Sequence, residues 1–522
     1  MSQASQNSTL PVSAPLARVR REKLCVAIQA KTVAEMLERA TQASADAHFL
    51  EFRLDSLAKP AEALQAVRQF LLNHQDVSAI ATCRRKKLGG AFTGTMAEEL
   101  ILLRKAAEAG CALVDLEIES AEAAKKADLA PFRSALKAAG AALLISFHDF
   151  AKTQQLIETS ARIEAFRPDY VKIVSTARSL KDNLAILRLI EEKSRTLQIV
   201  GIAMGEEGML SRILGIRSGG AFTFAAPSDG DGTAPGQLSM LELRTIYRAE
   251  QLDRATRLFG VAGNPVAHSL SPLMHNTAFH KASINAVLLP LKVRSVSDFI
   301  KVLRELPLAG AAVTMPLKQE VLPHLANTDP LTRRIGACNT LRIGGDGKIV
   351  GFNTDVAGII RPLEKRLKLK GARIAVLGAG GAARAAVFGL IDQGAEVYIV
   401  NRTHLSAVAL ARKAKAKTMK HEVFAKNHFD VLINSTPCGM KDAKQAMPIK
   451  ESELNAGLVF DMVYNPLETP LLKLARSRGI PVITGLEMFV QQGARQFEIW
   501  TGQPAPEAEM LRAVQLELSR RA

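Results

Sequence analysis

The chain contains few of the residues that mark secreted, membrane or metal-binding proteins. Its 522 residues include only five cysteines, and none form a CxxC pair. This spacing argues against a zinc site or a disulfide framework and suits a reducing compartment. No apolar run reaches the roughly 18 residues that a membrane span needs. We therefore expect a cytoplasmic protein with no membrane or metal site.

Aromatic residues are scarce as well, at 5% of the chain, although the formal charge is +17. Such a charge favours acidic partners. Proteins that bind single-stranded nucleic acid interleave basic and aromatic residues, and this sequence lacks that pattern. Small anionic substrates and a phosphate-rich cofactor fit the charge without nucleic acid. The sequence does not indicate an oligomeric state.

The first 17 residues are polar and rich in serine, with no apolar core of a signal peptide. We expect a flexible tail over residues 1–20, and a short organelle-targeting segment is the alternative. With 48% hydrophobic residues, the remaining chain is long enough to form two or three domains.

Eight short apolar runs alternate with helical patterns in the first half. The runs are 24–28, 49–54, 78–83, 111–118, 142–147, 170–174, 198–204 and 221–226. Eight strand–helix units in roughly 230 residues predict a (β/α)8 barrel over residues 21–250. A charged stretch over 238–257 is expected to form a closing helix.

Charged side chains lie in or just past the C-terminal half of these runs. They are Glu51, Arg53, Asp55, Arg84, Asp115, Glu117, His148, Asp149 and Lys172. That end of a barrel forms the active-site face. A structural ion pair explains one such strand, but five consecutive strands indicate a functional site.

Lys172 interrupts the apolar strand "DYVKIV" (169–174). A lysine among apolar neighbours and near arginines is expected to react as a neutral amine and to form a Schiff base with a ketone. The iminium then needs a base at the adjacent carbon, and His148 ends the preceding strand. Arg53, Arg84 and Arg212 are candidate clamps for a substrate carboxylate.

Several motifs of this half occur together in one enzyme family. They are "EFRLD" (51–55), "SFHD" (146–149), "DYVKIVSTA" (169–177), "GMLSRILG" (208–215) and "TAPGQLS" (233–239). From about residue 22 to 250 the chain resembles type I 3-dehydroquinate dehydratase. The resemblance implies a barrel that dehydrates 3-dehydroquinate to 3-dehydroshikimate through a Schiff base on Lys172, with His148 transferring protons. It also implies a substrate site lined by Glu51, Arg53, Arg84, Arg212, Thr233 and Gln237.

One position departs from that family. An acidic residue usually stands directly before the Gly-Gly pair and orients the histidine, but this chain has Leu88. Leucine accepts no hydrogen bond, so Glu117 or Asp115 would have to substitute. The alternative is a weak or inactive dehydratase barrel beside an active dehydrogenase.

The second half contains a strand, a glycine turn and a helix in "ARIAVLGAGGAARAAVFGL" (372–390). Gly378, Gly380 and Ala383 form a GxGxxA pattern in the context that dinucleotide-binding folds require. The next strand, 396–400, leads into Arg402 instead of an acidic residue, which favours the 2′-phosphate of NADP over NAD.

A second family resemblance covers about residues 258–520. It rests on "SLSP", "VTMPLK", "GACNT", "GFNTD", "GAGGAAR", "NRT", "NSTPCGM", "DMVYNPLETP" and "GLEMFVQQG", in this order. These motifs resemble shikimate dehydrogenase. The resemblance implies a substrate domain (256–358), a Rossmann-type NADP-binding domain (359–486) and C-terminal helices that return to the substrate domain (487–522).

The same resemblance implies the site residues of this half. Lys318 and Asp355 would form the catalytic pair. Substrate contacts would come from Ser269, Ser271, Thr314, Asn339, Tyr464 and Gln492. Cofactor contacts would come from Gly378, Ala379, Gly380, Gly381, Ala382, Asn401, Arg402, Thr403, Met462 and Gly485. The family often has a second basic residue four positions after the arginine of "NRT", but this chain has Ser406 there. Either Arg412 or Lys413 assists from farther along the helix, or the preference for NADP over NAD is reduced.

The two halves resemble consecutive steps of the shikimate pathway, which leads to chorismate and the aromatic amino acids. The expected protein is a fused bifunctional enzyme of α/β class. A ligand-binding regulator is the rival from another class, but mere binding does not need the pairs Lys172–His148 and Lys318–Asp355. Oxidation of quinate instead of shikimate is a further alternative.

Overall fold

The computed structural model describes residues 19–266, 269–441 and 443–521. The chain divides into two compact units, with the boundary between Ala255 and Thr256. Most of the expected N-terminal tail lies outside the described residues. Val19, near the end of that tail, is buried in the core of the first unit. No helix within the described ranges is both long and apolar enough to cross a membrane.

The first unit is a parallel eight-stranded sheet that curls into a barrel, as predicted. Its strands are β1 (Leu24–Ile28), β2 (Phe49–Arg53), β3 (Ser78–Thr82), β4 (Leu113–Glu117), β5 (Ala142–His148), β6 (Tyr170–Thr176), β7 (Gln198–Met204) and β8 (Thr223–Ala225). Each of β1 to β6 pairs with the next strand, and β8 pairs with β1. The Ala221 amide donates to the Ile199 carbonyl at 2.8 Å, which links the β8 side back to β7.

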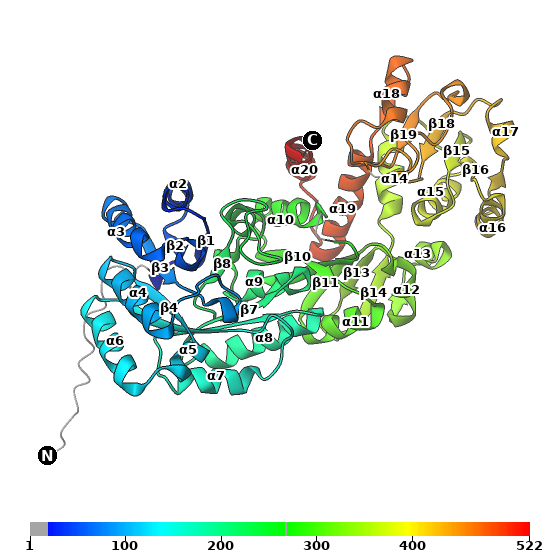
Figure 1. The fold of residues 1–522 in the computed structure, drawn as a ribbon. Coiled ribbons are helices and arrows are strands. Elements are labelled where there is room, and N and C mark those ends of the chain that lie inside the picture. The colour runs from blue at the N-terminus through cyan, green and yellow to red at the C-terminus, as the bar shows by residue number, and fades with distance from the viewer. Residues whose placement is uncertain (1–18, 267–268, 442, 522) are drawn as a thin grey trace. The chain divides into compact units, whose positions relative to one another are not determined.

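Helices follow most of these strands and lie outside them (Figure 1). They are α2 (Val33–Ser44), α3 (Ala63–Asn73), α4 (Met96–Glu108), α5 (Ile118–Ala123), α6 (Lys126–Ala138), α7 (Leu156–Glu164), α8 (Leu180–Lys193) and α9 (Met209–Leu214). Short turns of helix are η1 (Leu54–Ser56), η2 (Pro60–Glu62), η3 (Lys86–Leu88), η4 (Glu206–Gly208), η5 (Glu242–Ile246) and η6 (Ala249–Gln251). The strands are buried because helices cover one face and side chains fill the barrel from the other, as near-continuous apolar runs require.

The prediction of one closing helix over 238–257 is wrong about its length. Only short helical turns form there, η5 and η6, and Arg257 already begins the next strand. Arg248, between the two turns, has a φ of 50°, in the left-handed region that helices exclude.

The second unit contains two six-stranded sheets. The first has the order β10-β9-β11-β13-β14-β12 and mixes parallel and antiparallel pairs. Its strands are β9 (Arg257–Gly263), β10 (Ala286–Lys292), β11 (Leu308–Val313), β12 (Asn327–Thr328), β13 (Thr340–Ile343) and β14 (Ile349–Phe352). Its helices are α10 (Ser271–Lys281), α11 (Val296–Glu305), α12 (Leu317–Glu320), η7 (Leu322–His324), α13 (Pro330–Ile335) and α14 (Asp355–Glu364).

The other sheet is parallel, with the order β17-β16-β15-β18-β19-β20. Its strands are β15 (Arg373–Leu377), β16 (Glu396–Val400), β17 (Lys417–Thr418), β18 (Val431–Asn434), β19 (Val459–Asp461) and β20 (Val482–Ile483). Numbered from β15, this is the doubly wound order 3-2-1-4-5-6, whose ligand crevice lies at the carboxyl ends where the strand order reverses. Its helices are α15 (Gly381–Asp392), α16 (His404–Ala414), α17 (His421–Phe424), η8 (Glu451–Glu453) and α18 (Pro470–Ser477).

The chain ends in two helices, α19 (Gly485–Thr501) and α20 (Glu507–Arg521), which pack onto α10. α19 also packs closely along α14: a Cβ at Gly358 would lie 2.8 Å from the Met488 carbonyl oxygen, so only glycine fits. The last two helices thus pack on α10, one of the helices of the first six-stranded sheet.

Candidate active sites

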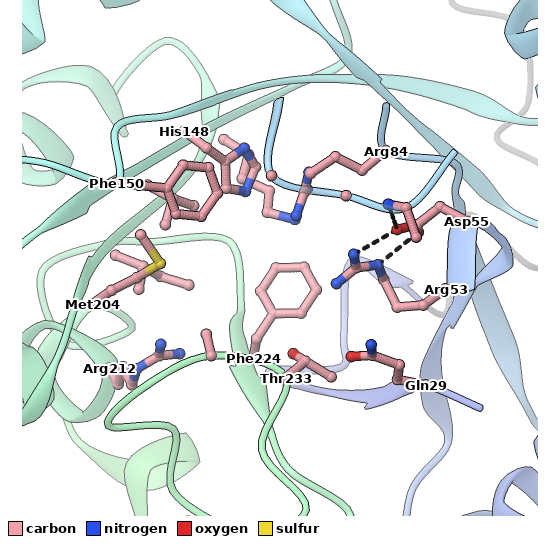
Figure 2. A pocket seen from close by; sticks show the side chains of 17 residues that line it. Gln29, Arg53, Asp55, Arg84, His148, Phe150, Met204, Arg212, Phe224 and Thr233 are labelled. Carbon is pink, nitrogen blue, oxygen red and sulfur yellow. Dashed lines mark hydrogen bonds and ion pairs between the residues drawn. The ribbon is translucent and has the colours of Figure 1, made fainter. Parts of the chain in front are cut away.

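A cavity of about 230 Å³ opens at the carboxyl end of the barrel strands. Six predicted site residues line it, namely Arg53, Arg84, His148, Lys172, Arg212 and Thr233. Gln29, Phe150, Met204 and Phe224 complete much of its wall (Figure 2). Gln29 directly follows β1, so it lies at the same strand ends as the predicted charged residues. It was missed from the sequence because only charged side chains were considered there.

Lys172 lies inside the barrel and is only 4% exposed. Its ammonium donates to Asp115 Oδ2 at 2.9 Å, lies 3.7 Å from Glu51 Oε1, and sits 4.2 Å from the Phe224 ring centroid. Besides the apolar neighbours and arginines that the sequence predicts, Lys172 therefore has two carboxylate neighbours. Alternate strands of a barrel point side chains into the same layer, so β4 and β2 bring carboxylates to the lysine of β6.

His148 is held by Glu117. Its Nδ1 lies 3.1 Å from Glu117 Oε1, and the Arg84 guanidinium donates to the same carboxylate. Burial opposes the charge of Glu117, but His148 and Arg84 hold its pKa at about 2. Burial and then the Arg84 charge lower the pKa of His148, against the pull of Glu117. The histidine is thus neutral near pH 7, with Nδ1 facing Glu117.

Leu88 ends the short turn η3 in the loop after β3. Gly89 follows with a φ of 80°, and a Cβ there would lie 2.3 Å from the Phe150 ring. The Phe150 ring in turn stacks near His148, with centroids 6.1 Å apart. The loop therefore packs over the histidine through Phe150, while Glu117 supplies the carboxylate that Leu88 lacks.

The arginines of the cavity differ in their partners. Arg53 forms a bidentate pair with Asp55 at 2.9 and 2.8 Å, and Arg84 is held by Glu117. Arg212 is 2% exposed, its Nε has no hydrogen-bond partner, and no ion pair to it is found among the described residues. Burial lowers the pKa of Arg212 to about 10. Figure 2 shows hydrogen bonds joining Arg53 to Asp55 but none reaching Arg212.

The remaining predicted residues of the barrel support the wall. Glu51 is buried and accepts a hydrogen bond from Thr82 Oγ1 at 2.6 Å. Gln237 Oε1 accepts from the Thr233 amide and hydroxyl, at 2.7 and 3.1 Å, and so fixes Thr233 at the cavity. Neither Glu51 nor Gln237 lines the cavity itself.

In the second unit, Lys318 and Asp355 form the predicted pair. Lys318 Nζ donates to Asp355 Oδ2 at 2.6 Å, and Asn339 Nδ2 donates to Asp355 Oδ1 at 2.8 Å. Lys318 belongs to α12, and Asp355 begins α14. Asn339 Oδ1 accepts hydrogen bonds from the Thr354 amide at 2.7 Å and from the Thr340 hydroxyl at 2.8 Å. This network fixes the carboxylate against the lysine.

Buried side chains support this network from α10 and α19. Gln496 donates to the Asn339 carbonyl at 3.2 Å and to Thr340 Oγ1 at 3.1 Å. Its own Oε1 lies 3.1 Å from His275 Nε2. Burial lowers the pKa of His275 to about 4, so this histidine is neutral and donates to Gln496. The sequence reading missed both residues because nothing in the motifs singles them out.

The other predicted substrate residues lie on several different elements of the second unit. Ser269 accepts from the Ser271 amide at 3.3 Å, at the start of α10. Thr314 precedes α12, and Gly263 packs against its methyl group. Tyr464 stacks on Phe489 of α19, with centroids 4.9 Å apart, and Gln492 lies one turn further along that helix. Among the described residues, no hydrogen bond joins Ser269, Thr314, Tyr464 or Gln492 to Lys318 or Asp355.

A larger cavity, of about 1440 Å³, lies at the carboxyl ends of β15, β16 and β18. Six predicted cofactor residues line it, namely Gly378, Ala379, Gly380, Asn401, Arg402 and Thr403. Gly381, Ala382, Met462 and Gly485 do not line it. The last two meet each other, since a Cβ on Gly485 would lie 2.6 Å from the Met462 carbonyl oxygen.

The glycine turn suits a dinucleotide. Gly378 has a φ of 113°, and a Cβ there would lie 2.6 Å from Ser435 Oγ, so only glycine fits. Gly380 precedes α15, and a Cβ on it would meet nothing within 4 Å, which leaves open space above the first turn of the helix. Phosphate groups favour this position because free backbone amides and the helix dipole attract anions.

Ser406 lines the same cavity, but Arg412 and Lys413 do not, so they are not the expected replacements for the missing basic residue. Lys420, which follows β17, lines the cavity instead. The sequence reading did not consider Lys420 because it lies 18 positions beyond Arg402, in a different strand–helix unit.

Family models match four parts of the chain. Residues 24–254 match type I 3-dehydroquinase, and 261–341 match the shikimate dehydrogenase substrate binding domain. Residues 362–460 match shikimate / quinate 5-dehydrogenase, and 485–515 match the shikimate 5′-dehydrogenase C-terminal domain.

Relatives match both halves. The chain is 33% identical over 510 residues to the chloroplastic bifunctional 3-dehydroquinate dehydratase/shikimate dehydrogenase of Arabidopsis thaliana, covering 92% of this chain and 82% of that protein. Its second half is 41% identical over 254 residues to the shikimate dehydrogenase (NADP(+)) of Maridesulfovibrio salexigens, covering 47% of this chain and 92% of that protein. A crystal structure of shikimate 5-dehydrogenase from Thermus thermophilus, in complex with NADP(H) and shikimate, aligns with a TM-score of 0.47 and 35% identity over 50% of this chain and 99% of that one. The chain belongs to the family of bifunctional 3-dehydroquinate dehydratases/shikimate dehydrogenases, and its cofactor is NADP.

Proposed function

We propose that the first unit dehydrates 3-dehydroquinate to 3-dehydroshikimate on Lys172, and that the second unit reduces 3-dehydroshikimate to shikimate with Lys318 and Asp355. The observation that carries this proposal is a pair of lysines, of which Lys172 is buried and Lys318 is half-buried. Each is bonded to a carboxylate, at 2.9 Å for Lys172–Asp115 and 2.6 Å for Lys318–Asp355, and each stands among the groups that its reaction needs.

The Lys172–Asp115 contact supports formation of the Schiff base. The amine must lose a proton before it attacks the ketone, and Asp115 Oδ2 is placed to accept that proton. Burial opposes the charge of Asp115, but Lys172 and Arg84 hold its pKa below the usual range, so it is ionised and ready to accept. Addition to the ketone and loss of water then give the iminium.

His148 is suited to the elimination that follows. Because Nδ1 faces Glu117, Nε2 is the nitrogen free to take the proton from the carbon beside the iminium. Glu117 stabilises the imidazolium that forms. The same histidine returns the proton to the hydroxyl that leaves as water, and hydrolysis of the imine releases 3-dehydroshikimate and restores the lysine.

Arg212 is the best candidate for the substrate carboxylate. Arg53 and Arg84 are already paired with carboxylates, whereas Arg212 has no such partner. A buried unpaired cation is costly, and an anionic ligand offsets that cost. Thr233, held by Gln237, adds a hydroxyl at the same wall.

In the second unit, Lys318 is placed to protonate the alkoxide that forms when the ketone is reduced, and Asp355 orients it. NADPH, when bound, supplies the hydride. Gly378, Gly380, Asn401, Arg402 and Thr403 would hold it, with Arg402 at the 2′-phosphate. We assign the substrate contacts of this site to Ser269, Ser271, Thr314, Tyr464 and Gln492, as the family motifs imply.

The same proposal assigns domain boundaries along the chain. The barrel occupies 21–250, the substrate domain 256–358, the NADP-binding domain 359–486, and the returning helices 487–522. Four buried free cysteines among the five are consistent with a reducing cytoplasm, although the Arabidopsis relative is named chloroplastic. Shikimate is preferred over quinate because Ser269 and Ser271 match the shikimate motif.

Two measurements on the full chain test the proposal. Borohydride added with 3-dehydroquinate should attach the substrate carbon skeleton to the peptide that contains Lys172, and Lys172→Met should abolish this labelling. Asp355→Asn should abolish NADPH oxidation with 3-dehydroshikimate while leaving the labelling intact. Labelling of a different lysine would refute the Schiff-base assignment, and faster turnover of quinate with NADP than of shikimate would refute the assigned substrate.

A further inference from the structure

We propose that Lys420 is a second 2′-phosphate ligand of the cofactor cavity, set beside Arg402 by the pairing of two strands. This inference rests on the proposed role of Arg402. It concerns a residue outside the "NRT" motif and explains how the chain binds NADP with Ser406 at the position where a second basic residue is usual.

The register of β16 and β17 places the two cations together. The strands are parallel, with Tyr398 opposite Lys417 and Ile399 opposite Thr418. The Met419 amide continues the pairing by donating to the Ile399 carbonyl at 3.1 Å. Lys420 therefore leaves β17 at the level of Asn401, next to Arg402, although 18 positions separate the two cations in sequence.

The backbone of Lys420 is fixed at this point. Its φ and ψ are −72° and 152°, and its carbonyl accepts from the amides of Val423 and Phe424 at 3.1 and 3.0 Å. Lys420 lines the cavity together with Arg402 and Ser406. Within the described ranges, the Lys420 ammonium and the Arg402 guanidinium have no ion pair, so both are free to bind an anion.

The charges at the rim of the cofactor cavity indicate that one cation is not enough to bind the 2′-phosphate. Glu422 also lines the cavity, and its carboxylate offsets one positive charge. His421 faces it too, but its ring is bonded to Glu453 at 3.0 Å. With Arg402 alone, this part of the rim would have no net charge, whereas Lys420 leaves it positive. A phosphate monoester carries nearly two negative charges at pH 7, and a second ammonium strengthens its binding.

Other basic residues are less well placed. Arg412 and Lys413 lie in the last turn of α16 and do not line the cavity. Lys444 lines it, but comes from the segment after β18, and β15 separates β18 from β16 in the sheet. Lys420 is the basic residue that the sheet brings next to Arg402.

The test measures binding to the full chain by isothermal titration calorimetry, with NADP, NAD and 2′,5′-ADP as ligands. Lys420→Ala should weaken NADP and 2′,5′-ADP roughly 10-fold and leave NAD within about 2-fold, because only the first two carry the 2′-phosphate. Lys420→Arg should retain most of the affinity. Lys426→Ala removes the same charge from an exposed residue nearby, outside the cavity, and should change nothing.

Equal weakening of NADP and NAD by Lys420→Ala, or no weakening of either, would overturn the assignment of Lys420. Arg402→Ala separates this result from the proposal on which it rests. If Arg402→Ala weakens NADP but Lys420→Ala does not, only the Lys420 assignment fails. If Lys420→Ala weakens NADP but Arg402→Ala does not, Lys420 is confirmed as a ligand and the role given to Arg402 fails.

Discussion

His148 Nδ1 lies 3.1 Å from Glu117 Oε1, at the carboxyl ends of the adjacent strands β5 and β4. This contact gives the histidine the carboxylate partner that Leu88 does not supply. The same carboxylate accepts from Arg84, so one buried glutamate orients both a proton-transfer group and a cation of the cavity.

Replacing Glu117 should therefore damage the dehydratase selectively. We expect Glu117→Gln to lower its kcat roughly 100-fold, because His148 loses the group that fixes its tautomer and stabilises its charge. Glu117 raises the pKa of His148, so its loss should also move the acidic limb of the kcat profile to lower pH. Steady-state kinetics across pH, with Glu122→Gln as an exposed control, measure both effects. An unchanged pH profile with normal kcat would show that Glu117 does not act on His148.

Restoring an acid at position 88 should bring little benefit. Because Glu117 already bonds to the histidine, Leu88→Glu should leave the dehydratase kcat within about 3-fold of the parent value. The assay follows formation of the enone of 3-dehydroshikimate. A rise of roughly 100-fold would mean that the histidine in the parent protein is poorly oriented, and that the barrel is the weak half of the enzyme.

Arg212 should destabilise the folded barrel but strengthen binding of 3-dehydroquinate. Its guanidinium is buried without a carboxylate, so Arg212→Met should raise the free energy of unfolding of the barrel by about 1–3 kcal/mol. The same change should raise the KM for 3-dehydroquinate by roughly 100-fold, because the substrate carboxylate loses its charged partner. Hydrogen exchange of the barrel strands measures stability, and Arg212→Lys serves as the charge-retaining control. A destabilised barrel with normal KM would contradict this account.

His275 should make the second unit sensitive to acid. Burial lowers its pKa from 6.5 to about 4, so below pH 6.5 the unfolded chain binds a proton that the folded unit excludes. Stability from this residue is complete above pH 6.5 and is lost as the pH falls to about 4, by about 3 kcal/mol.

Trp500 is the single tryptophan of the chain, and its ring centroid lies 5.0 Å from that of His275, so its fluorescence follows unfolding of this unit in urea. His275→Gln should flatten the dependence of stability on pH, whereas His428→Gln, at an exposed position, should not. The same slope in parent and His275→Gln would contradict the argument.

The barrel could be predicted because each strand is a short apolar run, and because the charged residues cluster at one end of those runs. The surroundings of Lys172 could not. Asp115 and Glu51 reach the lysine from other strands, 57 and 121 positions away, and the apolar residues next to Lys172 in sequence do not show this. Local sequence determines strand and helix, whereas the contacts inside the barrel depend on closure of the sheet.

The residues of the cofactor cavity could likewise be predicted only in part from local sequence. The glycine turn and Arg402 are recognisable because they follow a strand at short, regular spacing. The position of Lys420 beside Arg402 depends on the pairing of β17 with β16, which local sequence does not show. Arg384, which follows the glycines in sequence, donates to the Ile335 carbonyl and links α15 to the end of α13.

The most direct test of the central claim supplies 3-dehydroquinate and NADPH to the purified chain and follows enone absorbance and NADPH loss together. We predict that NADPH is consumed to the extent of the 3-dehydroquinate added, with shikimate as the product. Lys172→Met should lose NADPH oxidation with 3-dehydroquinate but keep it with 3-dehydroshikimate. Oxidation of NADPH by the parent protein with 3-dehydroshikimate, and none with 3-dehydroquinate, would contradict the claim that one chain performs both steps.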